Sequence, residues 1–253
     1  MSEEPKHHKV IHFTRMTLDQ LRAISKERQW SLSQVEMRAV QAYFKKLKRE
    51  PTDVELETLA QTWSEHCKHK TLTSPVSFRE KNEDGRTRQH KFKNLLKDTI
   101  FEATTRQKHD WLLSVFEDNA GIIALDAKWA VAFKVETHNH PSAIEPYGGA
   151  ATGTGGVIRD ILGAGRGARP IANTDTFCVG PLTHRGEMPP GLFHPKRTLR
   201  QITAGVRDYG NRMGIPTVNG NLAFHPGFLF NPLVFCGTVG IMPRTAVTKT
   251  VEN

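Results

Sequence analysis

The sequence predicts an α+β fold in which helices come first and a mixed sheet follows. The first observation is a pair of capping boxes, in which Thr17 precedes Gln20 and Ser33 precedes Glu36 by three residues. Such boxes open helices, because each pair of side chains satisfies backbone N–H groups that lack partners in the first turn. The second observation is a series of later segments with strand-like alternation. Helical segments separate them without a strict strand–helix–strand repeat.

Three helices are expected near the N-terminus. Leu18, Leu21 and Ile24 give the first helix its apolar face. The second runs to about Lys48, and its cationic end is interpreted as a solvated terminus that complements the helix dipole. A third helix is expected to start in the segment 51–55.

Strands dominate the rest of the chain. The polar segment 79–93 is expected to form an exposed hairpin tip or loop, and 180–195 a long proline-rich connection. The expected strands are 111–116, 122–125, 130–135, 174–179 and 233–241, with a helix over 197–213. These segments together predict a sheet with flanking helices.

The most informative segment is 133–160, because it concentrates residue types that phosphate and Mg²⁺ chemistry needs. Its first part alternates as a strand, with Val131, Phe133 and Val135 on one face. The opposite face carries Lys134, Glu136, His138 and His140 for as long as the chain stays extended, and Pro141 favours extension before it. A strand with one apolar face and one such polar face is expected to line a polar site.

A run of glycines, 148–156, follows, and a helix is expected over 157–162. Glycines before a helix let backbone N–H groups converge on an anion. Arg159 could bind a phosphate through its guanidinium, and Glu136 and Asp160 are oxygen donors that suit Mg²⁺. The spacing is not that of a P-loop or a dinucleotide fingerprint. A flexible glycine linker beside an ordinary surface strand remains the alternative.

Composition is that of a globular protein and excludes other classes. The chain has 253 residues, of which 38% are hydrophobic and 24% charged, and it has no apolar run of the ~20 residues that span a bilayer. Its three cysteines are far apart and the N-terminal ten residues lack a signal-peptide core, which favours a reducing cytoplasm. The net charge of +9 could indicate nucleic acid, but no binding module accompanies it.

These motifs resemble those of the phosphoribosylformylglycinamidine synthase family of purine biosynthesis. The resemblance is carried by the segments 135–143, 146–153, 63–71, 171–175, 217–221 and 231–234, and extends from about Leu18 to the C-terminus. It implies a helical linker region over 1–72, followed over 73–253 by the ATP-binding half of an aminoimidazole-ribonucleotide-synthetase-like domain.

The family joins formylglycinamide ribonucleotide, ATP and ammonia to give the amidine, ADP and phosphate, with Mg²⁺. The resemblance therefore implies ATP and Mg²⁺ as cofactors and a glutaminase subunit or domain as the ammonia source. It also implies the remaining C-terminal part of the synthetase as a partner, and a homo- or pseudo-dimer formed through the sheet. Neither nucleic acid nor a membrane is expected as a partner.

The resemblance also implies roles for single residues. His138 would be the proton acceptor and His66 a second active-site histidine. ATP would contact Lys134 and His69, and Mg²⁺ would be held by Glu136 and Asp160. The ribonucleotide would contact Thr137, His138, Asn139, His140 and Arg159.

Two departures from the family pattern matter. Many relatives have tyrosine where this chain has His69, which puts that ATP contact in question. The family's synthetase holds two such modules, so the chain is expected to be an N-terminal piece that does not complete a site alone. One alternative is a catalytically silent nucleotide-binding or dimerisation module. A kinase-like relative is a second, which the run Thr137–Pro141 argues against.

Two other site types were considered from the histidines. The cluster His66-Cys67-Lys68-His69 invites a zinc interpretation, but adjacent His and Cys side chains cannot both reach one metal without strain and no Cys-x-x-Cys partner follows. The contiguous triplet 138–140 also does not match the dispersed residues of a His-Asn-His nuclease.

Overall fold

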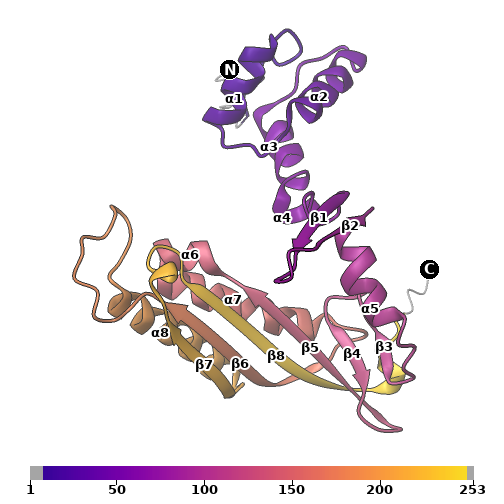
Figure 1. Ribbon diagram of the computed structural model, residues 1–253, viewed down its shortest axis with the longest axis vertical. Coiled ribbons are helices and arrows are strands. Elements are labelled where there is room, and N and C mark those ends of the chain that lie inside the picture. The colour runs from indigo at the N-terminus through magenta and orange to yellow at the C-terminus, as the bar shows by residue number, and fades with distance from the viewer. Residues whose placement is uncertain (1–7, 250–253) are drawn as a thin grey trace, which may run out of the picture. The chain divides into compact units, whose positions relative to one another are not determined.

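The computed structural model describes residues 8–249, which form two compact units, residues 8–107 and 108–249 (Figure 1). Residues 1–7 of the polar N-terminal segment lie outside the described residues. Among the residues described, no helix combines the length and the apolar character that crossing a membrane requires.

The first unit begins with the three expected helices, α1 (Leu18–Glu27), α2 (Gln34–Lys46) and α3 (Asp53–Thr62). Both expected capping boxes are present, and α3 begins with a third, formed by Thr52 and Glu55. One apolar core joins the three helices. Its buried residues are Phe13, Leu21, Trp30, Met37, Val40, Phe44, Leu56 and Ala60. The amphipathic pattern therefore predicted the three helices, and the structure shows that their apolar faces share one core.

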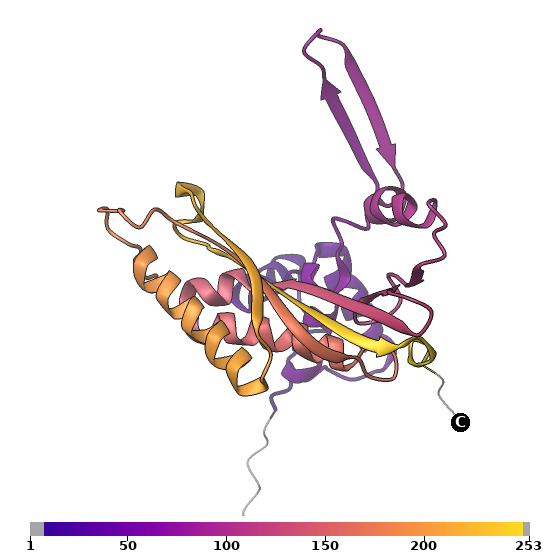
Figure 2. The same cartoon turned by 90° about the horizontal axis from the view of Figure 1, so that it is seen from below.

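A single-turn helix, α4 (Glu65–Lys68), follows α3, and β1 (Val76–Lys81) then pairs antiparallel with β2 (Thr87–Phe92). The segment 79–93, expected to be an exposed hairpin tip or loop, contains part of β1 and all of β2, and the hairpin is a separate two-stranded sheet (Figure 2). The unit ends in the π-helical turn η1 (Lys97–Phe101) and α5 (Glu102–Thr105).

The second unit is built on a six-stranded mixed sheet with the order β3-β4-β5-β8-β6-β7. Its strands are β3 (Leu112–Ser114), β4 (Gly121–Ala124), β5 (Trp129–Thr137), β6 (Arg169–Val179), β7 (Thr217–Phe224) and β8 (Leu233–Pro243). The last strand, β8, pairs antiparallel with both β5 and β6, whereas β6 and β7 are parallel. The expected strand over 111–116 is shorter in the structure. Short 3₁₀ turns, η2 (Pro226–Phe228) and η3 (Arg244–Ala246), flank β8.

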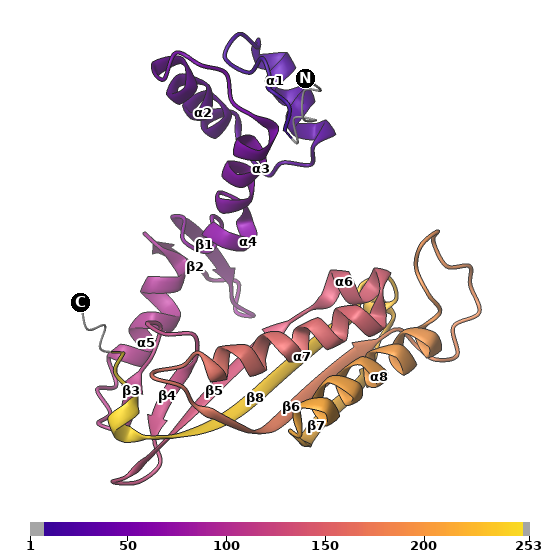
Figure 3. The same cartoon turned by 180° about the vertical axis from the view of Figure 1, so that it is seen from behind.

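Two long helices, α7 (Pro146–Leu162) and α8 (Pro195–Met213), lie side by side on one face of this sheet, and the short α6 (Asn139–Ile144) precedes α7 (Figure 3). Ala130 and Ala132 of β5 are fully buried beneath α7 together with Ile161. The other face of β5 carries Phe133 and Val135, which are 46% and 38% exposed. The expected alternation of the two faces is thus present. The helices cover the face that carries Ala130, Ala132, Lys134 and Glu136, and the face with Phe133 and Val135 is exposed.

The expected glycine loop is wrong, because residues 148–156 lie inside α7 rather than before it. The reason is packing. A Cβ added to Gly149 would lie 2.6 Å from the backbone nitrogen of Ser142, and one added to Gly155 would lie 2.7 Å from the Tyr209 ring. The glycines therefore allow α6 and α8 to approach the helix backbone. This contact energy outweighs their poor helix propensity.

The chain also does not stay extended through His140. Strand β5 ends at Thr137, and α6 begins at Asn139, so Pro141 lies inside a short helix. Proline is tolerated in the first turn of a helix, where its missing N–H would have no partner. His140 therefore does not share a strand face with Lys134, contrary to the expectation.

Candidate active-site cluster

Three charged side chains form the centre of the candidate site in the second unit. Lys134 and Glu136 are two residues apart on β5 and so share a face, the face that α7 covers. The Lys134 Nζ lies 2.9 Å from Glu136 Oε1 and 3.3 Å from Asp160 Oδ2 of α7. The structure thus brings Asp160, near the end of α7, to the two charged residues of β5, although the helix α6 lies between them in the sequence.

The ammonium of Lys134 is held by two carboxylates at once. Burial lowers its pKa, but hydrogen bonds and charge interactions with Glu136 and then Asp160 oppose this and leave the pKa of Lys134 raised. The side chain is only 26% exposed. Lys134 is therefore a fixed cation, and an ammonium has three donors, so one N–H remains for a further acceptor.

His138 lies at the point where β5 ends and α6 begins. Its backbone N–H donates to the Val234 carbonyl at 2.9 Å, and its own carbonyl accepts from the Ser142 hydroxyl at 2.6 Å. A Cβ added to Gly153 would lie 3.0 Å from the Cβ of His138 and 3.5 Å from the Cys236 sulfur. Both backbone groups of His138 are therefore fixed. Its half-buried side chain packs against α7 at Gly153, where a larger residue would be crowded.

The neighbouring residues of the motif have different positions. Asn139 Oδ1 accepts a hydrogen bond from the Val234 N–H at 2.8 Å, which anchors the start of α6 to β8. His140 is exposed in α6, and Thr137 is exposed at the last position of β5, opposite Phe235. The side-chain NH₂ of Asn139 keeps its donors, because only its oxygen takes part in this contact.

Arg159 precedes Asp160 on α7 and is exposed. Successive helix residues point about 100° apart at 3.6 residues per turn. Arg159 therefore leaves the helix in a different direction from Asp160, which meets Lys134.

His66 and His69 belong to the first unit and are both exposed. His66 lies in α4, whose N-cap Ser64 accepts from the Cys67 N–H at 3.3 Å. His69 ends that helix in the left-handed region, with φ 51° and ψ 47°. No group of three His, Cys, Asp or Glu residues suited to a metal ion occurs within residues 8–249.

A divalent cation fits the carboxylates of the second unit. Mg²⁺ is usually held by one or two protein carboxylates together with phosphate oxygens and water. Glu136 and Asp160 both contact the same ammonium, so their carboxylates face one position. The pair supplies the oxygen ligands that such an ion prefers.

Sequence reasoning missed a buried polar group on the same face of the sheet. Asp175 of β6 is 4% exposed, and its Oδ2 accepts a hydrogen bond from the Thr217 hydroxyl at 2.9 Å. Burial raises the pKa of Asp175, although the hydrogen bond from Thr217 acts in the opposite direction. Burial and the nearby Asp175 also raise the pKa of Cys236 to about 12. Asp175 lines a groove of about 740 Å³ between α8 and β7. The alternation of Asn173, Asp175 and Phe177 was the only signal that could have indicated inward-facing polar residues.

Comparison with known proteins gives two matching segments in the same order as the units. Residues 21–70 match the formylglycinamide ribonucleotide amidotransferase linker domain, and residues 117–242 match the N-terminal domain of AIR synthase related proteins. The subunit PurL of phosphoribosylformylglycinamidine synthase from Thermoplasma acidophilum is 40% identical over 230 residues, which are 91% of this chain and 27% of that protein. The chain belongs to the phosphoribosylformylglycinamidine synthase family.

Other members of this synthase family agree. The PurL subunit from Aquifex aeolicus is 37% identical over a match that covers 86% of this chain and 24% of that subunit. The structure of Thermotoga maritima PurL complexed with FGAR has a TM-score of 0.57 at 34% identity, over 86% of this chain and 28% of that one. The same protein complexed with ATP has a TM-score of 0.54 at 33% identity, over 86% of this chain and 29% of that one.

The chain spans about a quarter of the length of the synthase subunits that it matches. The comparisons confirm the family resemblance and the α+β fold, with linker helices followed by a synthase-type N-terminal domain. Residues 71–116 lie in neither matched segment, and residues 73–107 group with the linker helices. The domain boundary expected at residue 72 stays a prediction.

Proposed function

We propose that this chain is the N-terminal part of a synthetase that converts formylglycinamide ribonucleotide to the amidine. The reaction uses ATP and ammonia derived from glutamine. The observation that supports the proposal best is the cluster of Lys134, Glu136 and Asp160 within a chain whose relatives are phosphoribosylformylglycinamidine synthases. A T. maritima relative has been crystallised with ATP, ADP and FGAR.

The chemistry explains why these residue types are needed. An amide carbonyl is a poor electrophile, so its oxygen is first phosphorylated by ATP with release of ADP. Ammonia then adds to the imidate carbon, the attacking nitrogen loses a proton, and phosphate leaves. Fixed cations stabilise the charge that develops on the transferred phosphoryl group. Lys134, held between two carboxylates, is proposed to be one such cation and to contact ATP.

The remaining roles are proposed residue by residue. His138 accepts the proton of the attacking nitrogen, and His66 is a second active-site histidine. His69 contacts ATP. The ribonucleotide contacts Thr137, Asn139, His140 and Arg159 in addition to His138; the free amide N–H groups of Asn139 and the exposed Arg159 guanidinium support this.

Glu136 and Asp160 are proposed to hold Mg²⁺. When bound, the ion would neutralise charge on the nucleotide phosphates. The protein's own contribution there is to hold both carboxylates beside one ammonium, that of Lys134.

Partners and location follow from the same proposal. Ammonia comes from a glutaminase subunit or domain, and a T. maritima relative has been solved as PurLQS. The rest of the synthetase completes the site, in the cytoplasm. The exposed apolar face of the sheet, with Phe133 and Val135, is proposed to be covered by a second copy or by a second, similar module.

The test is amidine formation from formylglycinamide ribonucleotide, ATP, Mg²⁺ and ammonia. It is run with the chain alone and after addition of the C-terminal portion of a related synthetase. Activity only on complementation is the expected result. Activity of the chain alone would contradict the need for a second part. Inactivity of both, with folded protein, would favour the alternative of a nucleotide-binding or dimerisation module, which ATP binding by the chain would then identify.

A further inference from the structure

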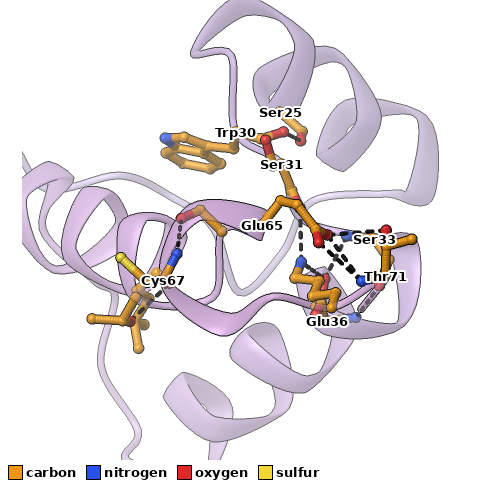
Figure 4. Close-up of polar contacts among 12 residues, drawn as sticks. Ser25, Trp30, Ser31, Ser33, Glu36, Glu65, Cys67 and Thr71 are labelled. Carbon is orange, nitrogen blue, oxygen red and sulfur yellow. Dashed lines mark hydrogen bonds and ion pairs between the residues drawn. The ribbon is translucent and has the colours of Figure 1, made fainter. Parts of the chain in front are cut away.

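One lysine anchors the histidine-bearing segment of the first unit to the helices before it. The Lys70 Nζ donates to the carbonyl of Ser31 at 2.9 Å and to Glu36 Oε2 at 2.8 Å. Figure 4 shows Ser31 and Glu36 converging from the start of α2 on the segment that carries Thr71. The side chains of Lys70 and Glu36 are only 26% and 25% exposed, so water screens this pair less than the surface pairs of the same unit.

A second contact closes the same segment on itself. The carboxylate of Glu65, at the start of α4, accepts from the Thr71 N–H at 3.0 and 3.2 Å and from its hydroxyl at 3.3 Å (Figure 4). The chain can return in this way because His69 adopts a left-handed conformation between them. That conformation is unfavourable for a residue with a Cβ and persists only where neighbouring contacts hold it.

The segment needs this support because α4 is too short to be stable by itself. A helix of four residues gains almost no internal hydrogen bonds, and nucleation of a helix costs more than it returns at that length. His66 and His69 are exposed, so no core packing fixes them. Ser64, Glu65 and Lys70 therefore determine where the backbone of the two histidines lies.

Glu36 has two tasks at once. Its carboxylate accepts from the Ser33 N–H in the capping box that starts α2, and from Lys70. Burial opposes ionisation, but the hydrogen bond from Lys70 and the bonds from Ser33 leave the pKa of Glu36 lowered. It is thus an anion on a well-packed helix, and it anchors the turn that carries Lys70.

We propose that Lys70, through Glu36 and Ser31, is a positioning residue that orients His66 for the reaction. This rests on the proposed function, in which His66 belongs to the active site. Lys70 is proposed to act through these two protein contacts and not through a contact with substrate or nucleotide.

The experiment compares variants of the complete synthetase that contains this chain. Lys70→Met keeps the length of the side chain and removes the charge. The matched control is Arg49→Met, which breaks another ion pair of the same helical unit, with Glu55 in the first turn of α3. We expect Lys70→Met to lower kcat about tenfold, since small displacements of a reacting group cost one to two orders of magnitude. Arg49→Met is expected to change kcat less than about twofold.

A double-mutant cycle with His66→Ala separates positioning from general destabilisation. If Lys70 acts through His66, Lys70→Met lowers kcat further by less than about twofold once His66 is absent, because coupled residues are not additive. Equal losses in both backgrounds would overturn the proposal. Glu36→Gln, which keeps a capping-box residue but loses the charge, is expected to lower kcat in the same direction, and Lys70→Arg to retain most activity.

A readout independent of turnover keeps this inference distinct from the proposed function. In NMR spectra of the 253-residue chain, we expect the ring resonances of His66 and His69 to shift in Lys70→Met and Glu36→Gln but not in Arg49→Met. Unchanged resonances in all variants would overturn the proposal even for an active enzyme. Shifted resonances in an inactive synthetase would support the anchoring while contradicting the proposed function.

Discussion

At the scale of single residues, His138 carries the proposed proton transfer. It lies at the turn between β5 and α6, and its backbone is fixed by Val234 and Ser142. We expect His138→Ala in the complete synthetase to lower turnover by ~10²-fold or more, the usual scale for loss of a general base. Steady-state kinetics with ammonia as the nitrogen source measure this. Near-normal turnover, with an unchanged melting temperature, would remove His138 from that role.

Asp160 tests the proposed magnesium site. Asp160→Asn removes one of the two carboxylates near Lys134 while keeping the size of the side chain. We expect a higher Mg²⁺ concentration to be needed for half-maximal activity, because the ion loses an anionic ligand. Circular dichroism checks that the fold is intact. A Mg²⁺ titration that coincides with that of the unchanged protein would contradict the assignment.

The glycines of α7 make a prediction at the scale of one element. Gly149→Ala would place a Cβ 2.6 Å from the backbone of Ser142, whereas Gly156→Ala meets no atom within 4 Å. We expect the first to destabilise the second unit by about 1–3 kcal/mol through overpacking. The second should stabilise it by about 0.5–1 kcal/mol through helix propensity. Chemical denaturation measures both, and equal effects would contradict the packing explanation.

The buried Asp175 on β6 makes a pH-dependent prediction for its strand. Burial raises the pKa of Asp175 in the folded state, so the folded protein resists its ionisation. Stability from this group is therefore greatest below pH ~3.9, the unfolded pKa, and declines as pH rises through the folded pKa.

Asp175→Asn removes that decline and keeps an oxygen to accept from Thr217. We expect the variant and the original protein to be equally stable near pH 3 and the variant to be more stable at pH 7. Thermal unfolding across this range provides the measurement. A variant that is less stable at pH 7 would show that the ionised carboxylate is needed.

At the scale of the whole molecule, the uncovered sheet face predicts self-association of the chain in solution. Phe133, Val135 and Ile123 are exposed large apolar residues on it. We expect Phe133→Glu to lower the sedimentation coefficient at high protein concentration, because a buried charge opposes an apolar contact. Val35→Glu is the matched control, since Val35 is 77% exposed on α2 of the first unit. A chain that is monomeric at all concentrations would contradict this prediction.

The sequence by itself determined the first three helices, because two capping boxes, a helix-start pattern at 51–55 and apolar faces are local signals. It also determined that Lys134 and Glu136 share a strand face and that the chain resembles the synthase family, since strand alternation and motif spacing are visible along the chain. These features can be inferred without knowing which segments of the chain contact each other in the fold.

Only the tertiary structure decided the rest. The glycines of 148–156 were expected in a loop because their helix propensity is low, yet contacts with Ser142 and Tyr209 place them inside α7. Asp160 reaches Lys134, and Lys70 reaches Glu36, because packing brings distant segments together. The physical reason is the same in each case: the energy of a contact between remote segments outweighs local propensity, and no local pattern records which segments will meet.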